Sequence, residues 1–239
     1  MGPLFVSRPT EAEPMGMVQL TSRFFEVLSR VRGKRIFHPH GIGFRATFQP
    51  AEEAGAAFRP LAQGSREAIV RVSRGLGLPE PLPDFFGFAV RLPDVHGAGR
   101  HQDFLLASGS ARPVLRHIVL PTFGLGCRSF TSLAPYVLDD RKVVVVAIAD
   151  PGTPRLDLGT LRSQGAADTV VRLGFATSAG PWEHVADIVL HDRLPVGETE
   201  PIGFNPVHTG GGLELAGLIN RVRLPAYVGS QKGRRCAQR

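Results

Sequence analysis

A pair of histidines near the start of the sequence could transfer a proton or bind a metal ion. His38 and His40 flank Pro39, and in a β-strand residues two apart share a face. The proline removes one ladder hydrogen bond and indicates a strand edge or a bulge. No third ligand of matching spacing accompanies the pair, so zinc binding is not favoured. A neutral imidazole, with an ordinary pKa of about 6.5, is instead well suited to take up and return a proton.

A second group of chemically capable side chains lies near the end of the sequence. If this stretch is helical, Arg223 and Tyr227 lie one turn apart, and Arg234 lies two turns further on the same face. An arginine beside a phenol favours the phenolate over the neutral form, whose ordinary pKa is about 10. A phenolate is an axial ligand of ferric haem. The sequence has two tyrosines, so Tyr136 is the other possible phenolate ligand.

Charge and composition exclude several other classes of protein. The net charge is +7, but lysines and arginines are scattered, and no nucleic-acid-binding motif accompanies them. Cys127 and Cys236 are too far apart for a CxxC motif. No apolar run is long enough to span a bilayer, and no charged-then-apolar secretory pattern opens the sequence. We therefore expect a cytoplasmic protein that binds neither nucleic acid nor a membrane through a spanning segment.

Hydrophobic periodicity predicts mainly short strands. An amphipathic helix is predicted over 18–33, and further helices over 155–166 and 213–224. Strands are predicted over 36–49, 68–74, 86–92, 103–108, 113–120, 143–149, 168–176 and 184–191. The run VVVVAIA at 143–149 is typical of a strand buried on both faces. The fold class is therefore α+β, dominated by an antiparallel sheet closed into a barrel.

Four ordered motifs give these elements a family resemblance. They are IFHPHGIGFRATFQP from residue 36, IVRVSRG from 69, DFFGFAVRLPD from 84, and IGFNP from 202 leading to NRVRLPAY and Arg234. The chain resembles the haem catalase family over about residues 35 to 235. The resemblance implies a leading helix, a catalase-type barrel and a C-terminal helix that carries the proximal haem ligand. It divides the chain into an N-terminal helical arm, 1–34, and a single haem-binding domain, 35–239.

The resemblance also assigns roles to individual residues. His38 matches the distal histidine and Ser73 the serine that hydrogen-bonds to it. Tyr227 matches the ligand of the haem iron, and Arg223 the arginine that keeps this phenol ionised. Further residues match arginines on the proximal face or at the haem propionates, or line the distal pocket: Arg35, Arg71, Arg234 and Phe37. Paired cations would also compensate for burying a dianionic cofactor.

Three departures from the family pattern modify the expected activity. Ala107 stands where catalases have the asparagine that orients bound peroxide, and Ser108 could replace it only if the strand register shifts. Phe37 makes the distal pocket bulkier and more apolar than in catalases. Pro225 predicts a kink or restart in the proximal helix, and a displaced Tyr227 would leave His38, His40 or Cys127 as the remaining ligands.

The resemblance, so modified, implies a haem b peroxidase that reduces organic or lipid hydroperoxides with a small organic electron donor. Catalase activity would be weak or absent. Two alternatives stay open: a hydroperoxide isomerase or lyase on the same haem site, and a barrel that binds haem or another apolar ligand without turnover. The chain is much shorter than ordinary catalases and lacks their associating arms, so a homo-oligomer is possible but its size is open.

Overall fold

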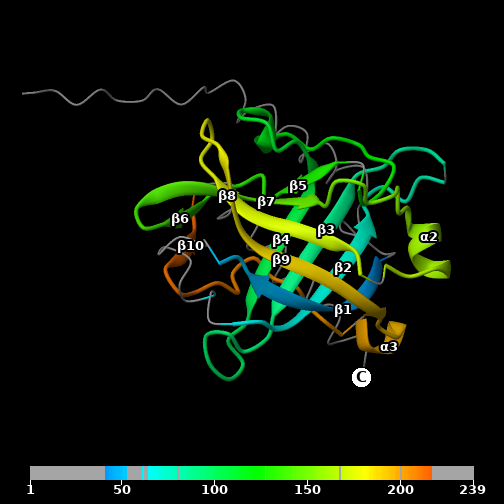
Figure 1. The fold of residues 1–239 in the computed structure, drawn as a ribbon, viewed down its shortest axis with the longest axis horizontal. Helices are drawn as coiled ribbons and strands as arrows, with labels where there is room; N and C mark the ends of the chain where they lie inside the picture. Colours follow the sequence, from blue (N-terminus) through cyan, green and yellow to red (C-terminus); the bar gives the residue numbers. More distant parts are fainter. Residues whose placement is uncertain are drawn as a thin grey trace, which may run out of the picture. The chain divides into compact units, whose positions relative to one another are not determined.

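A computed structural model describes residues 41–52, 61, 64–79, 81–126, 128–166, 168–199 and 201–216. Within these residues, eight antiparallel strands follow one another round a closed barrel in the order β7-β5-β4-β3-β2-β1-β9-β8, and β8 pairs with β7 to close it (Figure 1). The barrel strands are β1 Gly41–Pro50, β2 Arg66–Arg74, β3 Phe86–Leu92, β4 Gln102–Gly109, β5 Ser129–Thr131, β7 Arg141–Ala149, β8 Val170–Ala176 and β9 Trp182–Arg193. The predicted antiparallel barrel is confirmed.

Two short strands extend the sheet beyond the barrel, and three short helical turns lie between strands. The strands are β6 Tyr136–Leu138, which pairs with β7, and β10 Leu213–Leu215, which pairs with β6. The turns are the 3-10 helix η2 Leu115–His117 and the α-helices α2 Leu158–Ser163 and α3 Val196–Thr199. None of the helices in the described part of the chain is long and apolar enough to cross a membrane.

Alternating side chains fill the barrel. Bulky residues at every second position of β1 to β4, such as Phe44, Val70, Phe88 and Phe104, are completely buried in one core. Phenyl rings from neighbouring strands meet there: the ring centroids of Phe88 and Phe130 lie 5.5 Å apart. Because a strand alternates its faces, the residues between these core positions point to the outer surface of the barrel.

Strand β7 is buried on both faces, as its run of valines predicts. Val145 packs into the barrel core. Its neighbours Val144 and Val146 form a second apolar cluster with Ala176, against which Ala111 and Trp182 pack. The outer face of β7 is therefore covered at Val144 and Val146 by a loop and by the start of β9.

Most of the other predicted strands are confirmed with small changes in their ends, and α2 confirms a shorter helix within 155–166. The strand predicted over 113–120 is wrong: Val114 has a φ of 67°, and η2 follows it. Arg116 explains the difference, because its buried guanidinium donates hydrogen bonds to the carbonyls of Thr177, Ala111 and Gly180 and fixes this segment as a loop.

The helix predicted over 213–224 does not begin at residue 213. Gly211 and Gly212 have φ values of 62° and 85°, and the chain then enters β10 in extended conformation. Residues 217–224 lie outside the described part of the chain. So do the predicted helix over 18–33 and the predicted boundary between residues 34 and 35, which stay predictions.

Candidate functional site

Four residues with small side chains form a row on the outer surface of the barrel. Register partners join Gly41 to Ser73, Ser73 to Gly87, and Gly87 to Ala107, across strands β1 to β4. The next row consists of Ile42, Val72, Phe88 and Leu106, and all four belong to the core. The row of small residues, which we call the outer strip, therefore points away from the core.

The outer strip runs across four neighbouring strands. Neighbouring strands lie about 4.8 Å apart, so its four positions span about 14 Å. None of its members carries a side chain larger than that of serine. Such a surface can support one face of a planar ring system, which a row of leucines or phenylalanines could not do without large voids.

Arg71 lies beside the outer strip and packs over one end of it. A Cβ atom added at Gly41 would lie only 2.5 Å from Cζ of Arg71. The guanidinium therefore covers Gly41 closely. Any other residue at position 41 would push the Arg71 guanidinium aside. The arginine thus presents a positive charge at the edge of a small-residue surface. Its sequence-based role as a propionate partner stays a prediction, and the position fits that role.

Ser73 lies within the outer strip and is only 3% exposed. The histidine that the resemblance pairs with it, His38, precedes Gly41 by three residues and lies outside the described residues. The same holds for the remaining predicted haem-pocket residues: Arg35, Phe37, Arg223, Tyr227 and Arg234. The alternative ligands His40 and Cys127 are also outside the described part. Of the predicted site, the structure therefore places Arg71 and Ser73, and it brings them to the same surface.

Ser108 does not replace the asparagine of catalases. Strand β4 keeps its register, so Ala107 occupies the outer strip and Ser108 points the other way. The completely buried hydroxyl of Ser108 donates to the carbonyl oxygen of Leu120 at 2.6 Å and accepts from the backbone N–H of Phe86 at 3.0 Å. This hydroxyl therefore ties a loop to the barrel, and position 107 offers no hydrogen-bond donor from its side chain.

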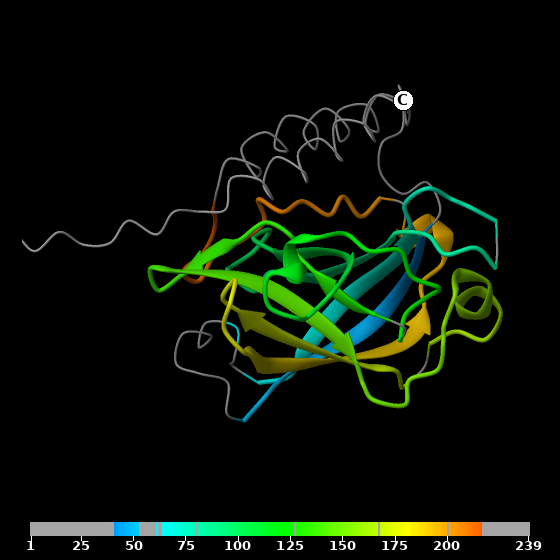
Figure 2. The ribbon, with the colours of Figure 1, turned by 90° about the horizontal axis from the view of Figure 1, so that it is seen from above.

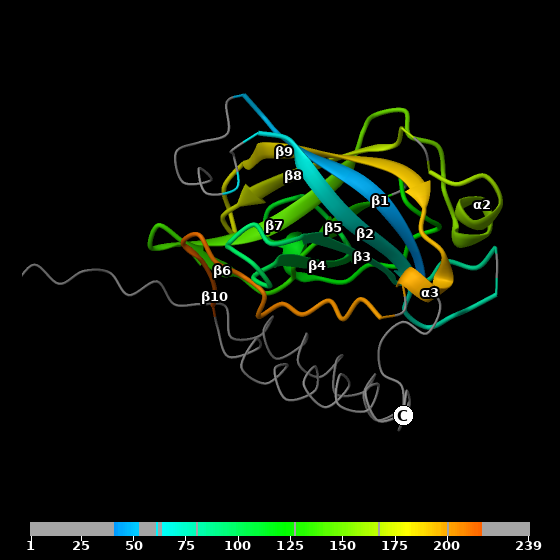
Figure 3. The same cartoon turned by 90° about the horizontal axis from the view of Figure 1, so that it is seen from below.

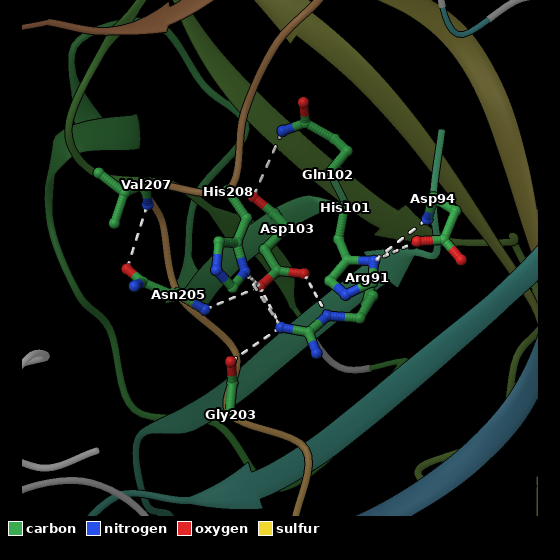
Figure 4. A network of polar contacts seen from close by, with 9 residues as sticks. All are labelled: Arg91, Asp94, His101, Gln102, Asp103, Gly203, Asn205, Val207 and His208. Carbon is green, nitrogen blue, oxygen red and sulfur yellow. Dashed lines mark hydrogen bonds and ion pairs between the residues drawn. The ribbon is translucent and has the colours of Figure 1, made fainter. Parts of the chain in front are cut away.

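A buried polar cluster on the same outer surface was not predicted from the sequence (Figure 4). Asp103 of β4 is completely buried, and its register partner is Arg91 of β3. The Arg91 guanidinium donates from Nε at 2.7 Å and from Nη2 at 2.6 Å to the two carboxylate oxygens. This two-pronged pairing supplies the counter-ion that a buried carboxylate requires. Four residues along each strand, or about 13 Å, separate the pair from the outer strip.

The cluster extends to the segment 201–216. The Asp103 carboxylate also accepts hydrogen bonds from the backbone N–H of Asn205 and from Nδ1 of His208, both at 2.8 Å. A carboxylate that is paired with a guanidinium can only accept, so the proton of this bond belongs to His208 Nδ1. Arg91 Nη2 additionally donates to the carbonyl oxygen of Gly203 at 2.8 Å.

These contacts hold the segment against the outer surface of β3 and β4. Figures 2 and 3 show it in orange, extended along one side of the barrel. The backbone N–H of Asp103 donates to the carbonyl of His208 at 2.7 Å, and the ring of Phe204 lies under the Arg91 guanidinium at 5.2 Å. The motif IGFNP is thus fixed against β3 and β4 by a charge pair from two different strands.

The sequence held only a weak signal for this cluster. A charged residue in each of two apolar strands is compatible with many registers, and only the register Arg91–Asp103 makes them partners. Within the described part of the chain, no group of three or more histidine, cysteine or acidic side chains is arranged to hold a metal ion. His38 and His40 lie outside that part, so the sequence argument about this pair stays a prediction.

No protein-family model matches the chain, and no curated protein matches it by sequence. Solved structures do match. The chain aligns with a fungal catalase and with catalase A from Saccharomyces cerevisiae, each with a TM-score of 0.58 and 13% identity, over 97% of its own length. The barrel has a catalase-like fold. The chain spans about two thirds of these catalases, 66% and 67% of their lengths, and at this identity the likeness extends to the fold alone.

Proposed function

We propose that this catalase-like protein is a haem-dependent peroxidase that reduces organic or lipid hydroperoxides with a small electron donor. The observation that carries the proposal is the outer strip with Arg71 at its edge. It occurs on the strands whose motifs resemble the catalase distal pocket, in a barrel with the catalase-like fold.

The described residues fit a haem on the outer strip. A planar macrocycle can approach a surface without bulky side chains, and the strip offers only glycine, serine and alanine over four strands. Two propionates need cations, and Arg71 lies at the edge of this surface. Tyr227 is the proposed iron ligand, Arg223 the residue that keeps its phenol ionised, and Arg35 and Arg234 further charge partners. When bound, haem would supply the redox centre at which the O–O bond is cleaved.

The side chains of the chain would handle protons and exclude water. His38 is the proposed base that takes the proton of the hydroperoxide and returns it to the departing oxygen. Ser73 is proposed to orient this imidazole, and its burial in the outer strip supports an ordered hydroxyl. Phe37, next to the histidine, would make the pocket apolar and favour an alkyl hydroperoxide over hydrogen peroxide.

Ala107 supports peroxidase activity over catalase activity. Catalases resemble this chain in the strand pattern but have an asparagine at this position. The hydroxyl of the adjacent residue, Ser108, cannot replace it, because this hydroxyl is engaged with Leu120 and Phe86. Removal of a donor that stabilises developing charge slows a reaction by about 100-fold or more. We therefore expect weak turnover of hydrogen peroxide.

The same observation favours a second candidate, a hydroperoxide isomerase or lyase. Without a donor that polarises the O–O bond, homolytic cleavage of this bond is favoured. Homolysis followed by rearrangement of the substrate needs no external reductant. The two candidates differ in their products. A peroxidase yields an alcohol only when a donor is present, whereas an isomerase or lyase consumes the hydroperoxide without one.

The first experiment is reconstitution of the full chain with haem, followed by absorption spectroscopy of the wild type and Tyr227→Phe. A high-spin ferric phenolate spectrum that disappears in this variant supports the proposal. Tyr136→Phe is the matched control, because Tyr136 is 2% exposed and lies in the core, so its spectrum should equal that of the wild type. Absence of haem uptake, or an identical spectrum in Tyr227→Phe, overturns the proposal.

Turnover then separates the candidates. In the peroxidase, His38→Ala loses most donor-dependent activity while the haem spectrum persists. Consumption of hydroperoxide without donor identifies the isomerase or lyase. An unchanged rate in His38→Ala, or no turnover by the haem-loaded wild type, indicates a barrel that binds haem without catalysis.

A further inference from the structure

Two loops at one end of the barrel present large apolar side chains to solvent. Leu78 and Leu82 lie between β2 and β3, and Phe123 lies between β4 and β5; they are 38%, 52% and 46% exposed. We call these three residues the apolar lip. Figures 1 and 3 show the loop between β2 and β3 at the same end of the barrel as α2. Soluble proteins seldom expose several large apolar side chains together without a binding function.

The lip is held in place by buried polar contacts. Asp84 is 1% exposed, and its carboxylate accepts hydrogen bonds from the backbone N–H groups of Leu76 at 2.9 Å and Leu78 at 3.1 Å. The backbone of Asp84 pairs with that of Thr122 through two hydrogen bonds, of 2.9 and 2.8 Å. These hydrogen bonds join the two loops and order the backbone that carries Leu78, Leu82 and Phe123.

Two exposed arginines flank Phe123. The Arg155 guanidinium lies over the ring, 4.8 Å from its centroid, and donates to the Phe123 carbonyl oxygen at 3.3 Å. Arg128 donates from Nε to the carbonyl oxygen of Pro121 at 2.9 Å. Both bonds are to neutral acceptors, and Arg155 also interacts electrostatically with the nearby Asp157 carboxylate.

Among the described residues of these two loops, Asp84 carries the carboxylate, and it pairs with Arg74. In the connection between β7 and β8, Asp150 pairs with Arg172, and the side chain of Asp157 caps α2 through the backbone N–H of Thr160. Glu80, in the loop between β2 and β3, lies outside the described residues. Apolar tips flanked by cations are the composition that binds the interface of an anionic bilayer, where leucine and phenylalanine enter the acyl boundary and arginine meets phosphate.

We propose that the apolar lip docks the protein on an anionic lipid surface. The lip lies next to the outer strip: the loop with Leu78 and Leu82 starts two residues after Ser73 and ends two residues before Gly87. Docking there would bring the candidate site close to the bilayer. The docking proposal rests on the proposed function and specifies its substrate class as hydroperoxides of membrane lipids.

The test is co-sedimentation of the full chain with phosphatidylcholine vesicles that contain or lack phosphatidylglycerol. We expect binding to the anionic vesicles, weakened about tenfold or more in Leu82→Asp/Phe123→Asp, since two apolar contacts are replaced by repelled charges. Arg155→Gln should weaken it less. Val207→Asp is the matched control, since Val207 is 39% exposed and lies in the segment 201–216, outside the two loops of the lip, and should bind like the wild type.

Turnover of a water-soluble hydroperoxide by Leu82→Asp/Phe123→Asp should equal that of the wild type, which separates docking from catalysis. A failed haem spectrum with intact vesicle binding overturns the proposed function alone. Docking is overturned if the wild type does not sediment with anionic vesicles, or if the control loses binding equally. It is also overturned if the double substitution instead dissociates a dimer, which would make the lip an interface between copies.

Discussion

The Asp103 carboxylate and the His208 imidazole, 105 positions apart in the sequence, are joined by a hydrogen bond of 2.8 Å between Oδ2 and Nδ1. The carboxylate is completely buried and is shared with Arg91, whereas the imidazole is 37% exposed. This pair is one of several contacts that hold the segment 201–216 to the barrel, together with the pairing of β10 with β6 and the buried side chain of Leu213. Arg91 and His208 both bind the negatively charged carboxylate of Asp103, so loss of this charge should weaken both contacts.

Asp103→Asn should destabilise the protein strongly. The substitution removes the charge opposite Arg91, whose guanidinium is only 11% exposed, and leaves a buried cation without its counter-ion. The expected loss in the free energy of unfolding is about 3–5 kcal/mol, measured by urea denaturation. Asp140→Asn is the control, since Asp140 lies exposed in a turn, and asparagine tolerates its φ of 60°. Equal stability of the two variants would contradict the role of the cluster.

Gly41→Ala should displace Arg71. The added methyl group would lie 2.5 Å from Cζ of this arginine, so the guanidinium must move from the edge of the outer strip. If Arg71 pairs with a propionate, haem affinity should fall about tenfold, an amount typical of a lost charge contact of 1–2 kcal/mol. Haem titration followed by absorbance measures this. Gly197→Ala meets no atom within 4 Å and should bind haem like the wild type; the same loss in both variants would exclude this explanation.

Ala107→Asn should increase the turnover of hydrogen peroxide. The outer strip would gain an amide donor at the position where the family pattern has one, with no change in the strand register. Under the proposed function we expect about a tenfold gain, a conservative fraction of what one such donor contributes. Oxygen release by the haem-loaded protein is the measurement. Ala89→Asn places the same amide two residues along β3 from the outer strip, in the row of Arg71, and should produce no gain.

Asp157→Ala should shorten α2 in a pH-dependent manner. The backbone N–H of Thr160 donates to the Asp157 carboxylate at 2.8 Å, and this bond is the largest cause that lowers the pKa of Asp157. The folded-state pKa lies below the unfolded value. The stabilisation is therefore complete above the unfolded pKa, about 3.9, and is lost as the pH falls through the folded value.

The expected cost of Asp157→Ala at pH 7 is about 1 kcal/mol, as for other N-caps, and the two proteins should converge in stability at pH 2. Thermal unfolding across pH measures the difference. A constant gap over the whole range would show that the charge of Asp157 is irrelevant to the cap.

The barrel could be predicted from the sequence because its strands alternate. Phe86–Leu92 was predicted with both its ends, since buried and outward residues alternate between a proline-rich turn and a Pro-Asp turn. Strands β5 and β6, of three residues each, are too short to show a period. The stretch 113–120 is apolar enough for a strand, but Arg116 bonds to carbonyls near residue 180, and no local pattern records such a distant partner.

The candidate site also contains features that could be predicted from local sequence and features that depend on distant parts of the chain. Ser73 and Arg71 lie two apart in one strand, so their shared surface followed from the period of a strand. The outer strip required the register of four strands, and the Asp103–His208 bond required the path of a segment that follows the whole barrel. Neither the strand register nor the path of this segment can be read from neighbouring residues in the sequence. The resemblance supplied the roles of single residues, but the contacts that fix segment 201–216 came only from the fold.

The pairing of β1 with β9 has a consequence for biosynthesis. Phe48 of β1 lies opposite Ile188 of β9. The strand β1, the first of the described barrel strands to be synthesised, therefore waits for nearly the whole barrel before its second edge is covered. Until then the nascent chain is an open, twisted sheet with exposed backbone donors and acceptors, which readily pair with other chains. We therefore expect the protein to depend on chaperones during translation, and a circular permutant that joins β9 directly to β1 should fold faster.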